Sequence, residues 1–151
     1  MTNLLKSRIL LDIAEAFPLF PIPHGQDLVD DVIGDDERSD IRGAFTGKSW
    51  NTISSAVLHQ DSEALMYFRP HAWAYYLPAF LKESISSDEE NDAISNMLVL
   101  SMRGRIKEYM ALLTPAQEAV MKAFFTWLVN THPVHQKRRE IDAILAQTRQ
   151  D

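Results

Sequence analysis

The sequence predicts an all-α fold, organised as one compact multi-helix domain of about six to seven helices over residues 1–151. The chain has only five glycines in its 151 residues, and several long segments carry apolar residues at the spacing of an amphipathic helix. Residues 114–117, Thr-Pro-Ala-Gln, form a strong helix start, because threonine caps, proline suits the first turn and glutamine closes a capping box. With 46% hydrophobic and 24% charged residues, the composition is that of a globular protein with a single core.

The first third of the chain predicts three helices separated by one loop. The first helix runs from residue 2 or 3 to Phe17, with apolar faces supplied by Leu4, Leu5, Ile9, Leu11 and Ile13. Residues 18–25 are a proline-rich loop, since Pro18, Pro21 and Pro23 do not permit a continued helix. Two short helices are predicted at Gln26–Ile33 and Asp35–Phe45, and Gly47 ends the second.

The middle of the chain carries the clearest core signal. A short helix is predicted to start at Thr52 or Ser54, whereas residues 63–68 are ambiguous between helix and strand. A longer helix starts at Pro70, contains Pro78 as a predicted kink, and presents an apolar stripe of Trp73, Tyr76, Leu77, Phe80 and Leu81. The Trp73, Tyr75, Tyr76 and Phe80 group also has the composition of an aromatic cage, but this spacing is more typical of core.

Three further helices complete the prediction. Ser87 is expected to cap a helix whose first turn is acidic and whose core face is Ile94, Met97, Leu98 and Ser101, with Gly104 at its end. The helix that starts at Thr114 places Met121, Phe124, Phe125 and Leu128 on one face until Pro133. A last helix is predicted from about Val134, with Ile141, Ile144 and Leu145 facing inward.

The negative charge is concentrated in one acidic segment, residues 27–40. The formal net charge is −6, and this segment alone contributes seven acids and one arginine, −7 + 1 = −6. Such a surface repels nucleic acid and attracts basic partners. We therefore take its acids as candidate partner-binding residues: Asp27, Asp30, Asp31, Asp35, Asp36, Glu37 and Asp40. The alternative is a solvated helix surface that aids solubility.

Sequence motifs for catalysis are incomplete. Gly47-Lys48-Ser49 ends like a P-loop, but the first glycine of that motif is required at Arg42, and an acid-rich stretch replaces the preceding strand. The chain has no cysteine. His132 and His135 are separated by a helix-breaking proline, which favours loop histidines over metal ligands. Asp27/Asp31 and Asp36/Asp40 share helix faces, but no calcium loop fits them. The sequence therefore predicts no catalytic site, metal or cofactor.

The N-terminal residues do not have the pattern of a signal peptide, because Lys6, Arg8, Asp12 and Glu15 interrupt any apolar core. No window has the 18 or more apolar residues typical of a membrane span. We therefore expect a cytoplasmic protein.

The segment FTGKSWNTISSAVLHQDSEALMYFRPHAWAYYLPAFLKESI, with the later LLTPAQEAVMKAFFTWL, resembles a family of small uncharacterised bacterial proteins. The resemblance covers roughly residues 41–130. Its signature is a tryptophan, an aromatic residue and a Tyr-Tyr-Leu-Pro-Ala-(Phe/Tyr)-Leu core, here Trp50, Phe68, Tyr75, Tyr76, Leu77, Pro78, Ala79, Phe80 and Leu81. Proteins of this kind are similar to the immunity partners of bacterial toxins, and the resemblance implies that function here.

Three functions remain open at this point. The first is an immunity protein without catalytic activity, which neutralises a cognate protein toxin by placing its acidic surface against the toxin's basic surface, with no role for nucleic acid or membrane. The second is a small helical regulatory or scaffold protein whose acidity serves only solubility. The third is an enzyme acting through paired carboxylates. The sequence does not set the oligomeric state.

Overall fold

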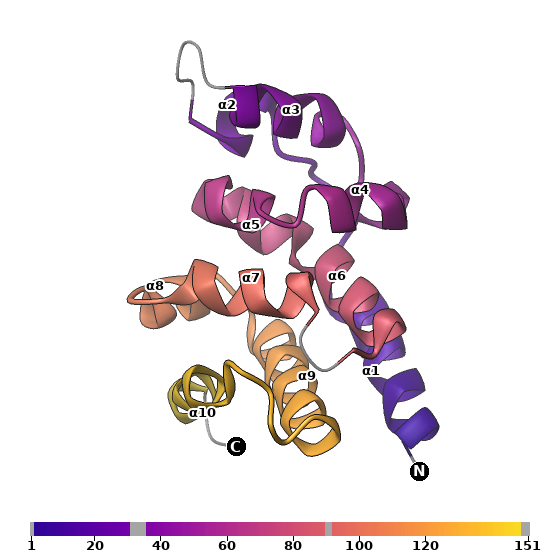
Figure 1. The fold of residues 1–151 in the computed structure, drawn as a ribbon. Helices are drawn as coiled ribbons and strands as arrows, with labels where there is room; N and C mark the ends of the chain where they lie inside the picture. The colour runs from indigo at the N-terminus through magenta and orange to yellow at the C-terminus, as the bar shows by residue number, and fades with distance from the viewer. Residues whose placement is uncertain (1, 31–35, 90–91, 149–151) are drawn as a thin grey trace.

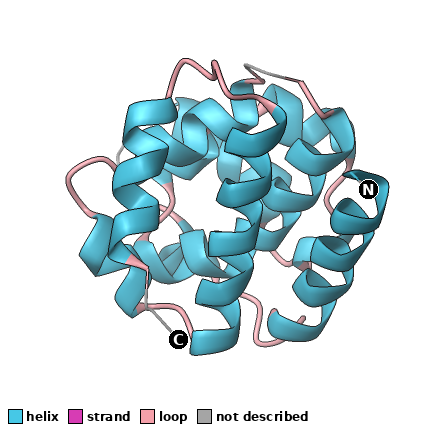
Figure 2. Ribbon diagram, turned by 90° about the horizontal axis from the view of Figure 1, so that it is seen from below, coloured by secondary structure: helices cyan, strands magenta, loops and turns pink. Residues whose placement is uncertain are grey.

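Helices supply the regular structure of residues 2–30, 36–89 and 92–148, which are the residues that the computed structural model describes. The all-α prediction is confirmed, and in this part of the chain Figure 2 contains helix and loop but no strand. The described residues form ten α-helices, of which six have seven residues or more, in one compact domain. The prediction of six to seven helices was too low because short helices of four to six residues fill the connections.

The helix bounds follow the predicted capping signals at Ser54 and Thr114 and depart from them at Ser87 and Val134. The elements are α1 (Thr2–Ala16), α2 (Gly25–Leu28), α3 (Asp36–Phe45), the 3₁₀ helix η1 (Trp50–Thr52), α4 (Ser55–Gln60), α5 (Ala64–Tyr67), α6 (Pro70–Ser87), α7 (Ala93–Met102), α8 (Ile106–Ala111), α9 (Pro115–Thr131) and α10 (Arg138–Gln147). Helix α6 is central, because α1, α2, α4, α7 and η1 all pack against it. In Figure 1, α2 and α3 lie at one end of the molecule and α10 at the other.

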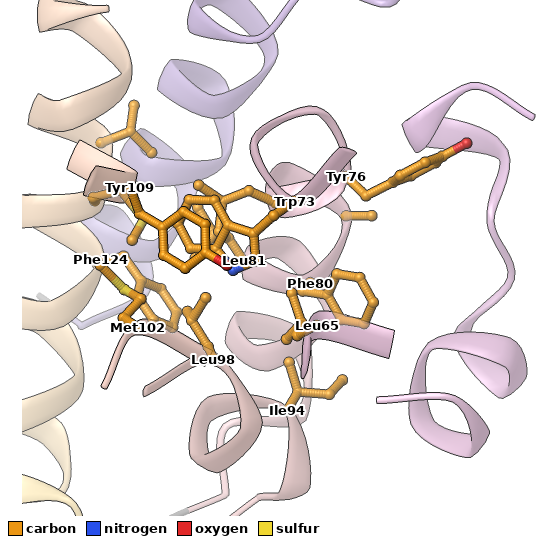
Figure 3. Close-up of a cluster of buried hydrophobic side chains, with 14 of the residues drawn as sticks. Leu65, Trp73, Tyr76, Phe80, Leu81, Ile94, Leu98, Met102, Tyr109 and Phe124 are labelled. Atoms are coloured by element: carbon orange, nitrogen blue, oxygen red, sulfur yellow. The ribbon is translucent and has the colours of Figure 1, made fainter. Parts of the chain in front are cut away.

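The aromatic stripe of α6 forms the middle of the core, as predicted. Trp73, Tyr76 and Phe80 are fully buried. The indole of Trp73 stacks on the ring of Tyr109 with centroids 4.4 Å apart, and its Nε1 donates to Ser101 Oγ at 2.9 Å. Figure 3 shows this stacked pair on one side of the cluster and Phe80 and Tyr76 on the other. These aromatics therefore stabilise the fold and do not form an exposed cage.

The predicted start of α9 is confirmed in detail. Thr114 Oγ1 accepts from the Gln117 backbone N–H at 3.2 Å, and Gln117 Oε1 accepts from the Thr114 N–H at 3.0 Å. Gln117 Nε2 also donates to the Ala16 carbonyl at 3.1 Å, which ties the end of α1 to α9. The Gln117 side chain therefore both caps α9 and joins it to the end of α1.

Several predicted boundaries were wrong because tertiary contacts override local propensity. The helix predicted at Gln26–Ile33 ends at Leu28, since Val29 is extended and forms a β-bridge with Phe68. Residues 31–35 lie outside the described residues. Ser87 is the last residue of α6, and Asp92 caps α7 instead.

Two terminal expectations also need correction. The last helix begins at Arg138, because residues between His132 and Lys137 form turns after α9. On α1, Ile9 and Ile13 are buried as expected, whereas Leu4, Leu5 and Leu11 are exposed. A helix that packs on only one side cannot bury apolar residues spread around its circumference.

Candidate functional site

Helix α3 presents the acidic segment to solvent because its two faces differ. Ile41 and Phe45 are buried beneath the helix, whereas Asp36, Glu37 and Asp40 are exposed on its surface. Asp36 and Glu37 stand in the first turn, where the helix dipole favours negative charge. The amphipathic pattern of α3 therefore places these three predicted partner-binding residues on one solvent-facing surface.

The support beneath α3 is rigid. The ring of Phe45 meets the rings of Phe68 and Tyr76 edge to face, each with centroids 5.1 Å apart. The Tyr76 hydroxyl lies 2.8 Å from the carbonyl oxygens of both Phe45 and Lys48. Burial raises the pKa of Tyr76, so the phenol stays protonated and remains a donor. Packing and hydrogen bonding together fix the end of α3 against α6.

Arginine contacts hold the other side of α3. Arg42 Nη2 donates to the carbonyls of Val29 and Asp30, at 3.2 and 2.9 Å. The guanidinium of Arg38 lies over the ring of Tyr67, 5.0 Å from its centroid. These contacts use the two arginines of α3 for anchoring, while Asp36 and Asp40 of the same helix are exposed.

The remaining predicted acids have different environments. The Glu37 carboxylate accepts a hydrogen bond from the Tyr67 hydroxyl, and Asp30 Oδ1 lies 3.9 Å from Arg69 Nη1. Asp27 is exposed on α2 and lines a groove beside the proline-rich loop. Asp31 and Asp35 lie outside the described residues. Among the described residues of the segment, the acids therefore have different surroundings and do not act as equivalent exposed charges.

The structure adds Asp61 to the acids of α3. Burial and the negative charge of Asp40 raise the pKa of Asp61, which caps the end of α4. Burial is the larger cause, and repulsion from Asp40 adds to it. We call Asp36, Glu37, Asp40 and Asp61 the acidic face. Sequence reasoning missed Asp61, because only the packing of α4 near α3 makes it a neighbour.

The Gly-Lys-Ser sequence is a helix stop, as predicted. Gly47 has φ = 75°, which a glycine adopts without strain. The segment before it is α3 and not a strand. Because Tyr76 holds the carbonyls on both sides of this turn, the turn closes α3 and does not have the strand–loop–helix geometry that cradles a phosphate.

Two serine–histidine contacts lack the geometry of a catalytic relay. His59 Nε2 lies 3.0 Å from Glu83 Oε2 and 3.4 Å from Ser87 Oγ, so one nitrogen serves both partners. A relay needs the acid on the opposite ring nitrogen. At the second contact, His135 Nδ1 accepts from the Lys137 N–H at 3.0 Å, which leaves Nε2 to donate to Ser95 Oγ at 3.0 Å. That serine is therefore not activated by a base.

His132 and His135, which stand three residues apart, do not converge on a common ligand position. His132 caps the end of α9 and lies 3.1 Å from Asp88 Oδ1. Within the described ranges, no three histidines or carboxylates are grouped to hold a metal ion. In the same part of the chain, no helix is both long and apolar enough to cross a bilayer.

The fold and this surface define an all-helical domain with an exposed acidic face. Residues 25–148 match the model of DUF6714, a family of unknown function, and the chain belongs to this family. The matched range includes the segment 41–130 on which the sequence resemblance rests, and it begins after α1 and most of the proline-rich loop. Comparisons with curated proteins and with solved structures gave no match.

Proposed function

We propose that this protein is a toxin-neutralising immunity protein that acts in the cytoplasm by binding. In this proposal the acidic face contacts the basic surface of a cognate protein toxin and blocks it. The observation that carries the proposal is the exposure of Asp36, Glu37 and Asp40 on one surface of α3. Exposed carboxylates on one surface attract a basic partner, which would neutralise their charge.

The scaffold supports the same proposal. An inhibitor that binds with little rearrangement loses less entropy on association. The acidic face rests on the packed rings of Phe45, Phe68 and Tyr76, and Arg42 fixes α3 to the chain beside it. Binding of this kind requires no catalytic group, metal or cofactor, and we assign none.

The alternative is a small helical regulatory or scaffold protein without catalytic activity. One observation favours it: part of the acidic segment has internal contacts, namely Glu37 with Tyr67 and Asp30 with Arg69. Acids that hold the fold together need no external partner. The two functions differ in whether the outward-facing acids change association with a basic protein.

Charge reversal on α3 tests the proposal. Asp36→Lys with Asp40→Lys changes the charge of the acidic face by four units. Glu15→Lys with Glu89→Lys makes the same net change at exposed positions on α1 and after α6. The partner to test first is the product of the neighbouring gene, co-expressed with each variant.

We expect the α3 variant to bind at least about tenfold more slowly at low salt, because electrostatic steering raises association rates by 10-fold or more. The control should differ from wild type by less than about threefold, and the wild-type association rate should fall as salt rises. Equal association rates and equal cell protection by wild type and the α3 variant would reject the acidic face as the interface.

A further inference from the structure

A groove of about 810 Å³ runs between the proline-rich loop and the start of α6. Pro21, Ile22 and Pro23 form one wall, and Pro70, His71 and Tyr75 form the other. His24, Asp27 and Arg69 complete the lining. We call this the loop–α6 groove.

Hydrogen bonds fix the start of the proline-rich loop, just before the residues that form the loop wall of this groove. The Tyr75 hydroxyl donates to the Leu19 carbonyl at 2.7 Å and accepts from the Trp50 N–H at 3.1 Å. Trp50 Nε1 donates to the Pro18 carbonyl at 3.1 Å. The loop therefore needs little ordering when a ligand binds, which favours affinity.

The opposite wall is equally fixed. The Arg69 N–H donates to the Leu28 carbonyl at 2.9 Å, beside the bridge between Val29 and Phe68. The Arg69 side chain donates from Nη1 to the Gln26 carbonyl at 3.3 Å and lies 3.9 Å from Asp30. Arg69 thus has Asp30 as a nearby carboxylate, in an ion pair whose two side chains are both more than half exposed.

Asp27 supplies the carboxylate of the groove lining. Among the residues that the structure describes, none donates a hydrogen bond to the Asp27 carboxylate or pairs with it. A cation is therefore the complementary ligand. The prolines and the Tyr75 ring provide flat apolar walls, and a guanidinium is the cation that packs best on such surfaces because it is planar and weakly hydrated.

An exposed aromatic residue lies next to the groove. Phe20 is 70% exposed although it is a large apolar residue, and it directly precedes Pro21 of the loop wall. Aromatic residues of this kind serve as anchors in protein interfaces. The groove is also linked to α3 through the chain, because Arg42 of α3 donates to the carbonyl of Asp30, three residues after Asp27.

From these contacts we propose that the loop–α6 groove receives an arginine side chain from an extended segment of the protein partner. Asp27 pairs with the guanidinium, the Tyr75 ring packs on its face, and Phe20 contacts the apolar residue beside it. This inference rests on the proposed function, since it assigns a recognition site to the same basic partner. The groove supplies specificity, and the acidic face of α3 supplies long-range attraction.

The test is a nuclear magnetic resonance titration of the full chain with acetyl-Leu-Arg-Leu-amide. The matched probe replaces arginine with citrulline, which keeps the shape and removes the charge. We expect saturable shifts at His24, Asp27, His71 and Tyr75 with the arginine peptide. Citrulline should bind at least about fivefold more weakly, the size expected for one partly exposed ion pair.

Two variants complete the experiment. Asp27→Asn should weaken binding of the arginine peptide by about fivefold, whereas Glu15→Gln on α1 should leave the affinity for this peptide unchanged. Absence of saturable shifts in the groove, equal binding of both peptides, or an unaffected Asp27→Asn variant would overturn the proposal. The titration uses no toxin. If the groove binds no peptide, the proposed role of the acidic face is still tested separately by the charge-reversal variants. If the groove binds the arginine peptide but the protein protects no cells, the immunity function is rejected and the groove proposal stands.

Discussion

The two acidic clusters of this protein, residues 27–40 and residues 83–92, differ in what their carboxylates contact. On α3, Asp36 and Asp40 are exposed and face solvent. In the second cluster, Asp92 is 4% exposed, and Asp88 lies within 2.8 Å of Lys6 and 3.1 Å of His132. Both clusters are rich in acids, yet Asp36 and Asp40 of the first are open to solvent, whereas Asp88 and Asp92 of the second are engaged by other residues.

The difference follows from where each cluster lies in the fold. Helix α3 covers one end of the molecule and turns one face outward. The second cluster lies where α6, α1, α7 and α9 converge, so its carboxylates meet backbone N–H groups and cations of other helices. An acidic run therefore indicates a binding surface only when the packing leaves its carboxylates without internal partners.

The largest expected effect comes from Asp92. Its Oδ1 accepts from the Ser95 N–H at 2.8 Å, and its Oδ2 accepts from Ser84 Oγ at 3.2 Å. Asp92→Ala removes the cap of α7 and leaves a buried hydroxyl without its acceptor, so we expect a loss of about 2–3 kcal/mol in unfolding free energy. Urea denaturation followed by circular dichroism measures it.

Asp40→Ala is the matched change in the first cluster. Because its side chain is exposed, the unfolding free energy should change by less than about 0.5 kcal/mol. If the two variants lose equal stability, the distinction between a structural and an available acidic cluster is wrong.

Asp92 also illustrates what sequence alone reveals. The acidic run after Ser87 correctly indicates a helix start nearby, but Ser87 itself still belongs to α6, which ends there because Asp88 adopts a left-handed conformation with φ = 50°. Aspartate tolerates this region better than most residues. The sequence therefore predicted a capped helix start in this region but placed the cap at Ser87 and not at Asp92, because both residue types are acceptable caps.

The other outcomes divide in the same way between local and tertiary causes. The capping box at Thr114 and the stripe of α6 depend on short-range spacing, and both are confirmed. The early end of α2 depends on the bridge from Val29 to Phe68, and the proximity of Asp40 to Asp61 depends on helix packing. Contacts between residues far apart in sequence leave no periodic signal, so these features required the structure.

A smaller effect is expected at Asp88. The hydrogen bond from Lys6 lowers the pKa of this carboxyl, with a further contribution from His132, against the opposing effect of burial. A folded-state pKa below the unfolded value means that the ionised form stabilises the fold. The contribution is present above the unfolded pKa of about 3.9 and is lost as pH falls through the lower folded-state pKa.

Asp88→Asn measures this contribution, since asparagine also tolerates the left-handed conformation. We expect the variant to be about 0.5–1 kcal/mol less stable at pH 7, the range of partly exposed ion pairs. The difference should shrink as the solution is acidified below pH 4, where the wild-type carboxyl becomes protonated. A difference that stays constant down to the lowest pH would mean that Asp88 acts through its backbone conformation and not through its charge.

The smallest expected effect concerns the pair that defines the acidic face. Burial and then the charge of Asp40 raise the pKa of Asp61, so Asp40→Asn should lower that pKa while leaving the contribution of burial. A raised folded-state pKa destabilises the ionised form, which means that stability is gained as pH falls through it. Removing the neighbouring charge should therefore raise stability at pH 7 slightly, by less than about 0.5 kcal/mol. The Asp61 carboxyl carbon, followed by nuclear magnetic resonance across pH 2–7, reports the shift directly, with Glu15→Gln as the distant control. An unchanged Asp61 titration in Asp40→Asn would show that burial alone sets its pKa, and the acidic face would then lose the electrostatic argument for a basic partner.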